Sequence, residues 1–314
     1  MLNWLVIGIG DIARKRALSA IEAEPRSRLH ALLTRDVRKA EAYAGVVAYT
    51  DLGEALRDQA IDVVYVASPV ALHAEQTIAC LRAGRHVLCE KPVAMNFAQA
   101  ETMAAAAWEA GRLLGVAYFR RLYPKLVRAK ELIAQGAIGK PTYLYATYHG
   151  WLESEERGWL RDPALAGGGP LYDVGSHRID ACNFLLGKPV RAMGMVSNAF
   201  HALKVEDSAT VLMEYAGGVH AVVDARWNSR LPRDEFRIVG VEGEIDLSPL
   251  NGPALRLAKS DGTVREEQLP AHANVHYPAV ENFVSAVEDG TPLMGPIEEA
   301  IWTDWVTQQV MDAR

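Results

Sequence analysis

Cysteine is scarce in this chain, and the three that occur, Cys80, Cys89 and Cys182, lie far apart in the sequence. Their spacing matches neither a disulfide framework nor a zinc site, and it favours a reducing, cytoplasmic location. No apolar run approaches the roughly 20 residues of a membrane-spanning helix. These absences argue against a disulfide-stabilised secreted domain and against a membrane protein.

Runs of lysine and arginine are also missing, and the formal net charge is -6. Because nucleic-acid binding requires a basic surface, the composition argues against that class of protein. The apolar start Leu2–Ile9 has no basic leader and runs into a glycine motif, so we expect a strand there and not a signal peptide. No acids with ligand spacing surround His272 or His276, and no catalytic metal is expected.

Residues 1–118 instead alternate short apolar runs with amphipathic stretches. Helices are predicted at Leu72–Ala83 and Phe97–Ala110, where apolar residues recur every three or four positions. The predicted strands are Leu2–Ile7, Leu29–Leu33, Val63–Ala67, His86–Leu88 and Leu113–Ala117. Such alternation is typical of the α/β class, with a doubly wound parallel sheet covered by helices on both faces. We therefore expect a Rossmann dinucleotide-binding domain over residues 1–118.

The pattern changes over residues 119–314, where strand-like runs follow one another and Gly217-Gly218 predicts a hairpin turn. This predicts an α+β domain with a large, mostly antiparallel, open-faced sheet that serves substrate binding and oligomerisation. The strands are expected at Pro141–His149, Val190–Ser197, Ala209–Tyr215, Val219–Trp227, Glu235–Val239 and Glu244–Leu247, and the helices at Tyr123–Gln135, Tyr172–Leu186, Pro278–Glu288 and Pro296–Met311. One face of the Val219–Trp227 strand is mixed in polarity. That suits the interface of a homodimer or homotetramer, although solvent exposure explains the same pattern.

The first predicted strand ends in Gly8-Ile9-Gly10-Asp11-Ile12-Ala13, which opens a helix. Gly8 permits a tight turn, Gly10 lets a pyrophosphate approach the backbone, and Ala13 allows close packing of the helix on the strand. The N–H groups at the helix start, at Asp11 and Ile12, then face the phosphates. We expect a dinucleotide at this turn.

The second strand ends in Thr34-Arg35, where NAD-specific sites usually place an acid that binds the ribose 2′-hydroxyl. A hydroxyl and a guanidinium suit the 2′-phosphate of NADP, which is the preferred cofactor on this interpretation. In the alternative, Arg35 is a solvated loop residue and Asp36 is the acid of an NAD site. Asp36 equally resembles a cap on the next helix.

Two further strand ends carry candidate site residues. Ser68-Pro69 follows Val63–Ala67 and is placed to line the cofactor, with His73 either touching the cofactor or starting a helix. Glu90-Lys91 follows His86–Leu88 at the carboxyl edge of the sheet, where ligands of α/β proteins bind. There Lys91 can hydrogen-bond a substrate oxygen and stabilise the charge that develops on it, whereas Glu90 is expected to hold the backbone or the ribose.

A second polar cluster, Asp173, His177 and Asp180, is spaced so that its members share one face of a predicted helix. Apolar neighbours indicate that the helix is buried, and buried ionisable groups require partners or a function. A structural Asp–His pair and a catalytic pair both fit this pattern.

The order of these motifs resembles the glucose–fructose oxidoreductase/inositol dehydrogenase/MocA (Gfo/Idh/MocA) family over nearly the whole length. The resemblance is specific in the combination of Glu90-Lys91-Pro92 with Asp173-x-Gly175-x-His177-x-x-Asp180. It implies an NAD(P)-dependent oxidoreductase of sugars or polyols in which Lys91, Asp173 and His177 converge beside the nicotinamide. His177 would move the proton, Asp173 would orient it, and Lys91 would bind the same oxygen. In some relatives the lysine is taken as the proton donor.

The remaining candidates concern the domain junction and the substrate. Phe119 stands where many relatives have a polar residue. Arg120 or Arg121 is expected to face the cleft and to contact an anionic substrate group or the cofactor, to which Arg120 is assigned. Pairing with surface acids is the alternative for both arginines. Trp159, Arg161 and Tyr277 are the substrate candidates, since aromatic faces suit sugar rings. Two other functions stay open: a non-catalytic NAD(P)-binding regulator, which would not need Lys91, Asp173 and His177 together, and an NAD-dependent glycosidase of the same family.

Overall fold

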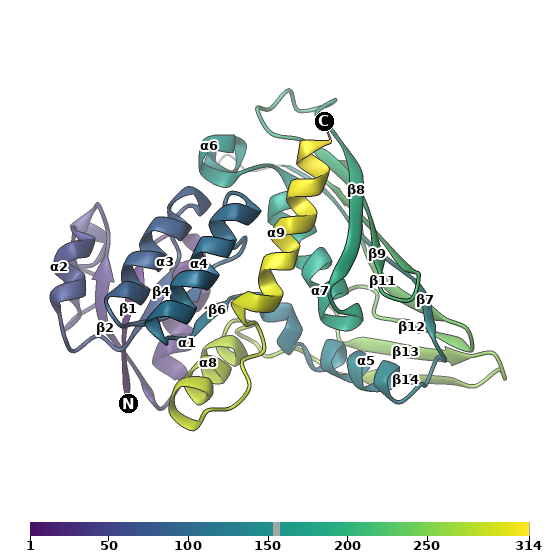
Figure 1. The fold of residues 1–314 in the computed structure, drawn as a ribbon, viewed down its shortest axis with the longest axis horizontal. Helices are drawn as coiled ribbons and strands as arrows, with labels where there is room; N and C mark the ends of the chain where they lie inside the picture. Colours follow the sequence, from purple (N-terminus) through teal and green to yellow (C-terminus); the bar gives the residue numbers. More distant parts are fainter. Residues whose placement is uncertain (153–157, 314) are drawn as a thin grey trace. The chain divides into compact units, whose positions relative to one another are not determined.

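The computed structural model describes residues 1–152 and 158–313, and the chain divides into two units (Figure 1). The first unit comprises Met1–Phe119 together with His272–Ile301. The second comprises Arg120–Ala271 together with residues 302–314. The last helix, α9 (Ile297–Asp312), begins in the first unit and ends in the second.

A six-stranded parallel sheet forms the first unit, in the order β3-β2-β1-β4-β5-β6. This is the strand order of a doubly wound dinucleotide-binding fold, and it confirms the predicted class. The order reverses between β1 and β4, and at such a point the loops leaving the strands separate and leave room for a ligand. The strands are β1 (Leu2–Ile7), β2 (Ser27–Leu33), β3 (Val47–Tyr49), β4 (Val63–Val66), β5 (His86–Cys89) and β6 (Leu114–Val116).

Helices cover both faces of this sheet because its central strands are buried and apolar on both faces over Trp4–Ile7 of β1 and Val63–Val66 of β4. Leu5 and Ile7 of β1 belong to a core shared with α3 and α4, which lie side by side in Figure 1. Trp4 and Val6 point to the opposite face, into a core shared with α1 and α8. The helices of this unit are α1 (Leu18–Ala23), α2 (Leu52–Arg57), α3 (His73–Arg82), α4 (Phe97–Ala110) and α8 (Tyr277–Asp289), and a π-helical segment, Ala13–Ala17, precedes α1.

The structure differs from the predicted domain division for residues 272–301. These were assigned to the second domain with the rest of 119–314, but they pack with the first unit. Val280, Phe283 and Val284 of α8 are fully buried in the core that contains Trp4. The amphipathic pattern of a helix shows that it has an apolar face, but it does not show which sheet that face covers.

An eight-stranded sheet forms the second unit, in the order β14-β13-β12-β11-β7-β10-β9-β8. Every neighbouring pair is antiparallel except β7 and β10, so the predicted mostly antiparallel sheet is confirmed. Gly217 and Gly218 have positive φ values of 82° and 79° and form the predicted turn between β9 and β10. The strands are β7 (Pro141–Trp151), β8 (Pro189–Ser197), β9 (Ser208–Tyr215), β10 (Val219–Arg226), β11 (Asn228–Gly240), β12 (Gly243–Asp246), β13 (Ala254–Lys259) and β14 (Val264–Gln268).

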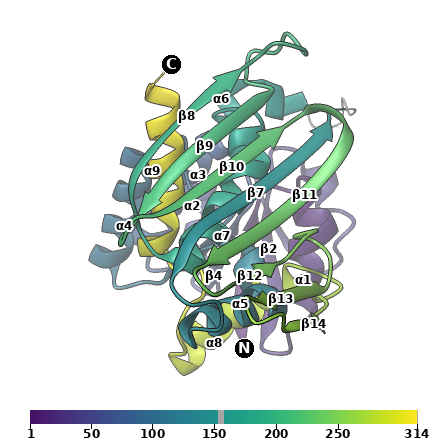
Figure 2. The same cartoon turned by 90° about the vertical axis from the view of Figure 1, so that its right-hand side faces the viewer.

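One face of the second sheet is buried under helices of its own unit. Alternate residues along β10 are buried, with α7 packed against β7 and β10 and the end of α9 against β8. Figure 2 looks onto the other face, with α7 behind the strands. The helices here are α5 (Pro124–Ala134), α6 (Pro163–Ala166) and α7 (Ser176–Leu186), preceded by a π-helical turn, Leu171–Gly175.

None of the helices in the described parts of the chain has the length and apolarity that crossing a bilayer requires.

Candidate active site

The glycine turn after β1 has the geometry that the sequence predicts. Gly8 has φ +91°, and a Cβ there would lie 2.9 Å from the carbonyl oxygen of Ala67, so only glycine fits. A Cβ at Gly10 would meet nothing within 4 Å, which leaves open space in front of the helix start. Ala13 is fully buried against the sheet. The open space and the helix N-terminus fit a dinucleotide pyrophosphate.

Asp11 and Ile12 lie at the start of this helix. The carboxylate of Asp11 accepts a hydrogen bond from Arg14 at 2.8 Å and one from Lys15 at 3.3 Å. These contacts, the Arg14 bond first, lower the pKa of Asp11, so it stays ionised and paired with its own helix. Only the backbone of Asp11 and Ile12 is then available to phosphate oxygens.

At the end of β2, the residues expected to decide between NADP and NAD, Thr34, Arg35 and Asp36, have different surroundings. Arg35 is exposed, and no hydrogen bond or ion pair joins it to another described residue. Asp36 caps the short helical turn Val37–Lys39 by accepting from the Arg38 N–H at 3.3 Å. The Arg38 guanidinium also binds both carboxylate oxygens of Asp36, at 2.8 and 3.0 Å, and this contact lowers the pKa of Asp36. The Thr34 hydroxyl accepts from the Asp36 N–H at 3.2 Å.

His73 bridges the two loops that leave β4 and β5. Its Nε2 lies 2.9 Å from the carbonyl oxygen of Ser68, and its Nδ1 lies 2.9 Å from that of Pro92. The side chain is buried, and burial lowers its pKa. Since both ring nitrogens face backbone carbonyls, the geometry favours the structural alternative for His73 over direct contact with a cofactor. The Ser68 hydroxyl donates to Gln76 at 2.7 Å, while Pro69 is half-buried.

Lys91 directly follows β5 at the carboxyl edge of the first sheet, and it is half-buried. The carboxylate of the preceding residue, Glu90, is buried and receives hydrogen bonds from Tyr65, His276 and the backbone N–H of Lys91.

Tyr277, a predicted substrate residue, also belongs to the first unit, where its ring stacks on His272 and its hydroxyl donates to Glu281.

In the second unit, Asp173 lies in the π-helical turn and His177 in the first turn of α7. Asp173 is half-buried and His177 is 6% exposed. A Cβ at Gly175 would lie 3.2 Å from the carbonyl oxygen of Pro170 and 3.4 Å from Ala225 of β10, so this glycine allows the helix to approach the sheet closely. π-Helical turns are rare and are frequently found at functional sites.

Glu206 fixes the glycine loop in front of this helix, a role that the sequence did not reveal. Its Oε1 accepts from the N–H of Gly169 at 2.8 Å and from that of Leu171 at 3.2 Å, and its side chain is buried. A Cβ at Gly169 would overlap the carbonyl oxygen of Glu206. An acidic side chain in a loop ordinarily indicates a solvated position, so no local signal could have identified this contact.

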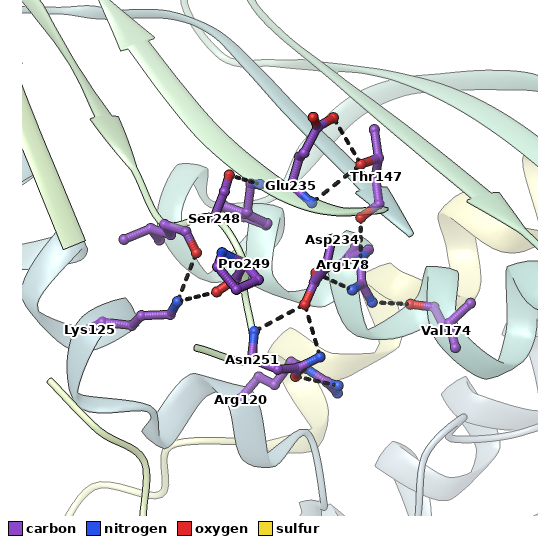
Figure 3. Close-up of polar contacts among 12 residues, drawn as sticks. Arg120, Lys125, Thr147, Val174, Arg178, Asp234, Glu235, Ser248, Pro249 and Asn251 are labelled. Carbon is purple, nitrogen blue, oxygen red and sulfur yellow. Dashed lines mark hydrogen bonds and ion pairs between the residues drawn. The ribbon is translucent and has the colours of Figure 1, made fainter. Parts of the chain in front are cut away.

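Figure 3 shows a polar network of the second unit around Asp234 of β11. Arg178 Nη2 donates to Asp234 Oδ1 at 2.6 Å, and the backbone N–H and Nδ2 of Asn251 donate to Oδ2 at 3.1 and 3.0 Å. Arg120, a predicted cofactor residue, donates from Nε and Nη2 to Asn251 Oδ1 at 3.2 and 3.0 Å. Desolvation, followed by repulsion from Arg178, lowers the pKa of Arg120 to about 10, so it remains cationic at neutral pH.

Three further hydrogen bonds anchor this network, also drawn in Figure 3. Lys125 of α5 is fully buried, and its Nζ donates to the carbonyl oxygens of Leu247 and Pro249, both at 2.7 Å. It thereby holds the loop that carries Asn251. Arg178 Nη1 donates to the carbonyl oxygen of Val174 at 3.2 Å, so the network ends on the π-helical turn that contains Asp173.

The two remaining substrate candidates lie close together in the sequence of the second unit. Trp159 and Arg161 belong to the helical turn Gly158–Arg161, with the Trp159 side chain 38% exposed and Arg161 half-buried. Within residues 1–152 and 158–313, no three metal-ligating side chains gather into a group.

Comparison with known proteins matches both units. Residues 2–118 match a family model described as an oxidoreductase family with an NAD-binding Rossmann fold, and residues 126–246 match the GFO/IDH/MocA C-terminal domain. The chain is 31% identical over 316 residues to a 1,5-anhydro-D-fructose reductase from Ensifer adhaerens, a match that covers 96% of this chain and 93% of that protein.

Solved structures agree with this result. A 3-ketoreductase from Actinomadura kijaniata, in complex with TDP-benzene and NADP, has a TM-score of 0.84 and 26% identity, covering 96% of this chain and 94% of the other. A levoglucosan dehydrogenase in complex with NADH shares the fold, with a TM-score of 0.90 and 22% identity over 99% and 96% of the two chains. The protein is therefore a dehydrogenase or reductase of the GFO/IDH/MocA family of NAD(P)-dependent oxidoreductases.

Proposed function

We propose that this enzyme transfers a hydride between NADP and a sugar, polyol or sugar-derived ketone, with Lys91, Asp173 and His177 handling the proton and the oxygen of the substrate. The observation that carries the proposal is the position of Lys91, directly after β5 at the carboxyl edge of the NAD-binding sheet. The nicotinamide supplies the hydride in reduction and accepts it in oxidation.

The protein side chains would provide the proton and stabilise the charge on oxygen. In reduction, hydride addition to the carbonyl carbon leaves a negative charge on the oxygen, which the Lys91 ammonium group would bind. His177 would donate the proton that completes the alcohol, and Asp173 would orient its imidazole. In oxidation the same groups act in reverse, and His177 accepts the proton.

The surroundings of β2 support NADP over NAD. Asp36, the acid that would bind a ribose hydroxyl, is held in a bidentate ion pair by Arg38 and is used as a helix cap. Arg35 is exposed next to it, and its guanidinium and the Thr34 hydroxyl suit a 2′-phosphate. The pyrophosphate would lie over Gly8 and Gly10, with Ser68, Pro69 and Arg120 lining the remainder of the cofactor. Glu90, whose oxygens accept from Tyr65, His276 and the Lys91 N–H, would hold the backbone and not the ribose.

Replacing Arg35 with alanine should weaken NADPH binding by about ten- to a hundredfold, the effect of losing a charge-assisted hydrogen bond. NADH binding should be unchanged, since NADH lacks the phosphate. The measurement is a fluorescence titration of the unaltered protein and of Arg35→Ala with NADPH and with NADH, all at the same ionic strength.

Arg28 provides the matched control, because it is an exposed arginine of β2, the strand that precedes Arg35, with four strand residues between it and the strand's end. Arg28→Ala should bind both nucleotides as the unaltered protein does. Tighter binding of NADH than of NADPH by the unaltered protein would contradict the NADP preference. That result would instead indicate that Asp36 or a backbone group binds the ribose hydroxyl of NADH.

The substrate proposal is tested by a panel read at the nicotinamide absorbance. We propose 1,5-anhydro-D-fructose and other sugar ketones with NADPH, and levoglucosan, aldoses and inositols with NADP⁺. Trp159 would pack on the apolar face of the sugar ring, Arg161 would donate to its hydroxyls, and Tyr277 remains the third proposed contact. Absence of turnover with every compound and both nicotinamides would overturn the proposed function.

We also propose that the protein is a cytoplasmic homo-oligomer that associates through the open face of the second sheet. The three cysteines are buried thiols that form no disulfide within the described residues, which suits a reducing compartment. On the open face, Met193, Leu212, Val222 and Tyr145 are paired directly across β8, β9, β10 and β7 and form an apolar strip. Met193 is 47% exposed and Leu212 is 40% exposed, although both are large and apolar. Arg237 pairs with Tyr145 across β11 and β7, and Glu214 and Asp224 lie on the same face, two residues from Leu212 and Val222, as in an interface with a polar rim.

Two glutamates in this strip should separate the subunits, because unpaired charges cannot be buried between them. The variant Met193→Glu/Leu212→Glu should have the mass of one chain, 34.4 kDa, by light scattering, while the unaltered protein has a multiple of it. Val241→Glu, an exposed residue of the β11–β12 turn, is the control and should leave the mass unchanged. A single-chain mass for the unaltered protein would contradict the proposal.

A further inference from the structure

The carboxylate of Glu90 is a buried charge with three donors around it, all within the first unit. The hydroxyl of Tyr65, in β4, donates to Oε1 at 2.7 Å, and His276 Nε2 lies 3.1 Å from the same oxygen. Oε2 accepts from the backbone N–H of Lys91 at 3.2 Å. The exposed fractions are 6% for Glu90, 2% for His276 and zero for Tyr65. With so little exposure this carboxylate gains little stabilisation from solvent, and its neighbours must supply the remainder.

The electrostatic balance at Glu90 favours the ionised form. Burial raises the pKa of the carboxyl, but the hydrogen bond and charge of His276, the Tyr65 bond and the Lys91 charge together hold it below its ordinary value. Of these opposing contributions, the hydrogen bond from His276 is the largest. An ionised carboxylate can accept from all three donors at once, whereas a protonated one loses acceptor capacity.

His276 comes from the C-terminal segment that packs on the first unit, 186 residues after Glu90 in the chain. Its backbone N–H donates to Asn274 Oδ1 at 3.1 Å, and its ring lies 4.7 Å from the ring of Phe119, measured between centroids. It immediately precedes α8, whose residues Val280 and Phe283 are fully buried. The imidazole is thus held in place from the backbone, from one ring face and from the helix that follows.

We propose that His276 is a positioning residue for Lys91. His276 holds the Glu90 carboxylate in place, and this carboxylate accepts a hydrogen bond from the backbone N–H of Lys91. The backbone of Lys91 is thereby fixed, and so is the position from which its side chain extends. Tyr65 assists from the same side, on the same oxygen. The inference rests on the proposed function of Lys91 and adds to it a residue whose side chain touches neither the substrate nor the reacting atoms.

The test compares His276→Ala with His30→Ala. His30 of β2 belongs to the same unit, and its Nε2 also lies against a carboxylate oxygen, Asp58 Oδ2 at 2.8 Å. Neither residue of that pair belongs to the proposed site, so His30 is a matched control. We expect His276→Ala to lower kcat by about tenfold or more, since a one-ångström misplacement of a reacting group has effects of this order or larger. The Kd for NADPH should stay within about twofold, and the control should retain full kcat. The readouts are NADPH fluorescence, melting temperature and turnover of the best substrate in the panel.

A pH series separates positioning from a merely structural role. Without His276, burial is less opposed and the pKa of Glu90 rises, so the carboxylate is lost at a higher pH than in the unaltered protein. The kcat of the variant relative to the unaltered enzyme should therefore fall as the pH is lowered toward the acid limit at which both proteins stay folded. The titratable and charged groups that act on Glu90 or are acted on by it are Tyr65 of β4, His73 of α3, Lys91 of its own segment, and His276, while Cys89 acts on Tyr65.

Two milder variants keep the proposal falsifiable if His276→Ala folds poorly. His276→Gln retains a donor and should recover part of kcat, and Tyr65→Phe removes one donor without changing the ring and should lower kcat in the same direction. Variants with the kcat and pH profile of the unaltered enzyme, or that lose only melting temperature, would overturn the positioning role. Inactivity of the unaltered protein with both nicotinamides would instead overturn the proposed function on which it rests.

Discussion

Replacing Lys91 with alanine is expected to lower turnover by about a hundred- to a thousandfold while leaving NADPH affinity within a few-fold. The reason is that the ammonium group would stabilise the charge that develops on the substrate oxygen, and removing one such donor has effects of this size in other enzymes. Because a contact made mainly in the transition state affects kcat more than KM, the loss should appear chiefly in kcat. The measurement is steady-state turnover together with a fluorescence titration of NADPH.

Lys91→Arg should not restore the activity, because a planar guanidinium on a longer side chain cannot replace a compact ammonium at the same distance. Lys140→Ala is the control: Lys140 is a lysine of the second unit whose Nζ donates to the carbonyl oxygen of Gly217. It should retain full turnover. If Lys91→Ala instead unfolds, or loses nucleotide affinity in proportion to its turnover, then Lys91 has a structural or cofactor-binding role and not the proposed one.

The parts of the site that were predictable are those with a local signal. A glycine turn between a strand and a helix, and a lysine directly after an apolar strand, can each be recognised within about ten residues, because the strand and the turn are set by neighbouring side chains. Gly8 shows this well, since its positive φ follows from a turn that the flanking residues already define. Asp173 and His177 were likewise predicted to lie on one helix.

The helix itself differs from the prediction in its first turn. Residues Leu171–Gly175 are π-helical, and the α-helix begins only at Ser176. A π-helical turn contains more residues than an α-helical one, so the rule that residues i and i+4 share a face does not transfer to Asp173 and His177 unchanged. Nothing in the local sequence distinguishes the two helix types, because both require the same apolar and small residues.

Contacts between distant segments could not be predicted at all. Glu90 meets His276 and Arg120 meets Asn251 across 186 and 131 residues. Each partner is an ordinary polar residue of a loop or a helix start, with no periodicity that marks it. Such pairs depend on which elements the fold brings together, and the packing of residues 272–301 on the first unit was itself not evident from the sequence.

Asp180 illustrates the same limit, because it shares the polar spacing of Asp173 and His177 but has a different partner. In the structure it accepts from Arg121 in a fork, with Nε 3.0 Å from both carboxylate oxygens and Nη2 2.7 Å from Oδ1. Both side chains are 1% exposed. A fully buried ion pair at this position joins the segment before α5 to the middle of α7, so its role is to hold the helix that carries His177.

Removing one member of this pair should therefore destabilise the second unit strongly. Asp180→Ala leaves a buried guanidinium without its carboxylate, and breaking a buried pair in this way costs about 3–5 kcal/mol. The expected result is a clear drop in the urea concentration at the unfolding midpoint at pH 7. The measurement is urea unfolding monitored by intrinsic fluorescence. Because Asp180 lies one helical turn after His177, turnover should fall as well, even under conditions where the variant remains folded.

The double variant Arg121→Met/Asp180→Leu provides the decisive comparison. Replacing both charges by apolar side chains of similar size removes the desolvation penalty together with the attraction, so most of the lost stability should return. Arg191→Ala breaks the exposed pair with Glu214, whose atoms are 3.0 Å apart, and should leave the midpoint unchanged. If Asp180→Ala has the same urea midpoint as the unaltered protein, the Arg121–Asp180 pair does not hold α7. If the double variant is stable but inactive, the ion pair serves the placement of His177 and not only the stability of the unit.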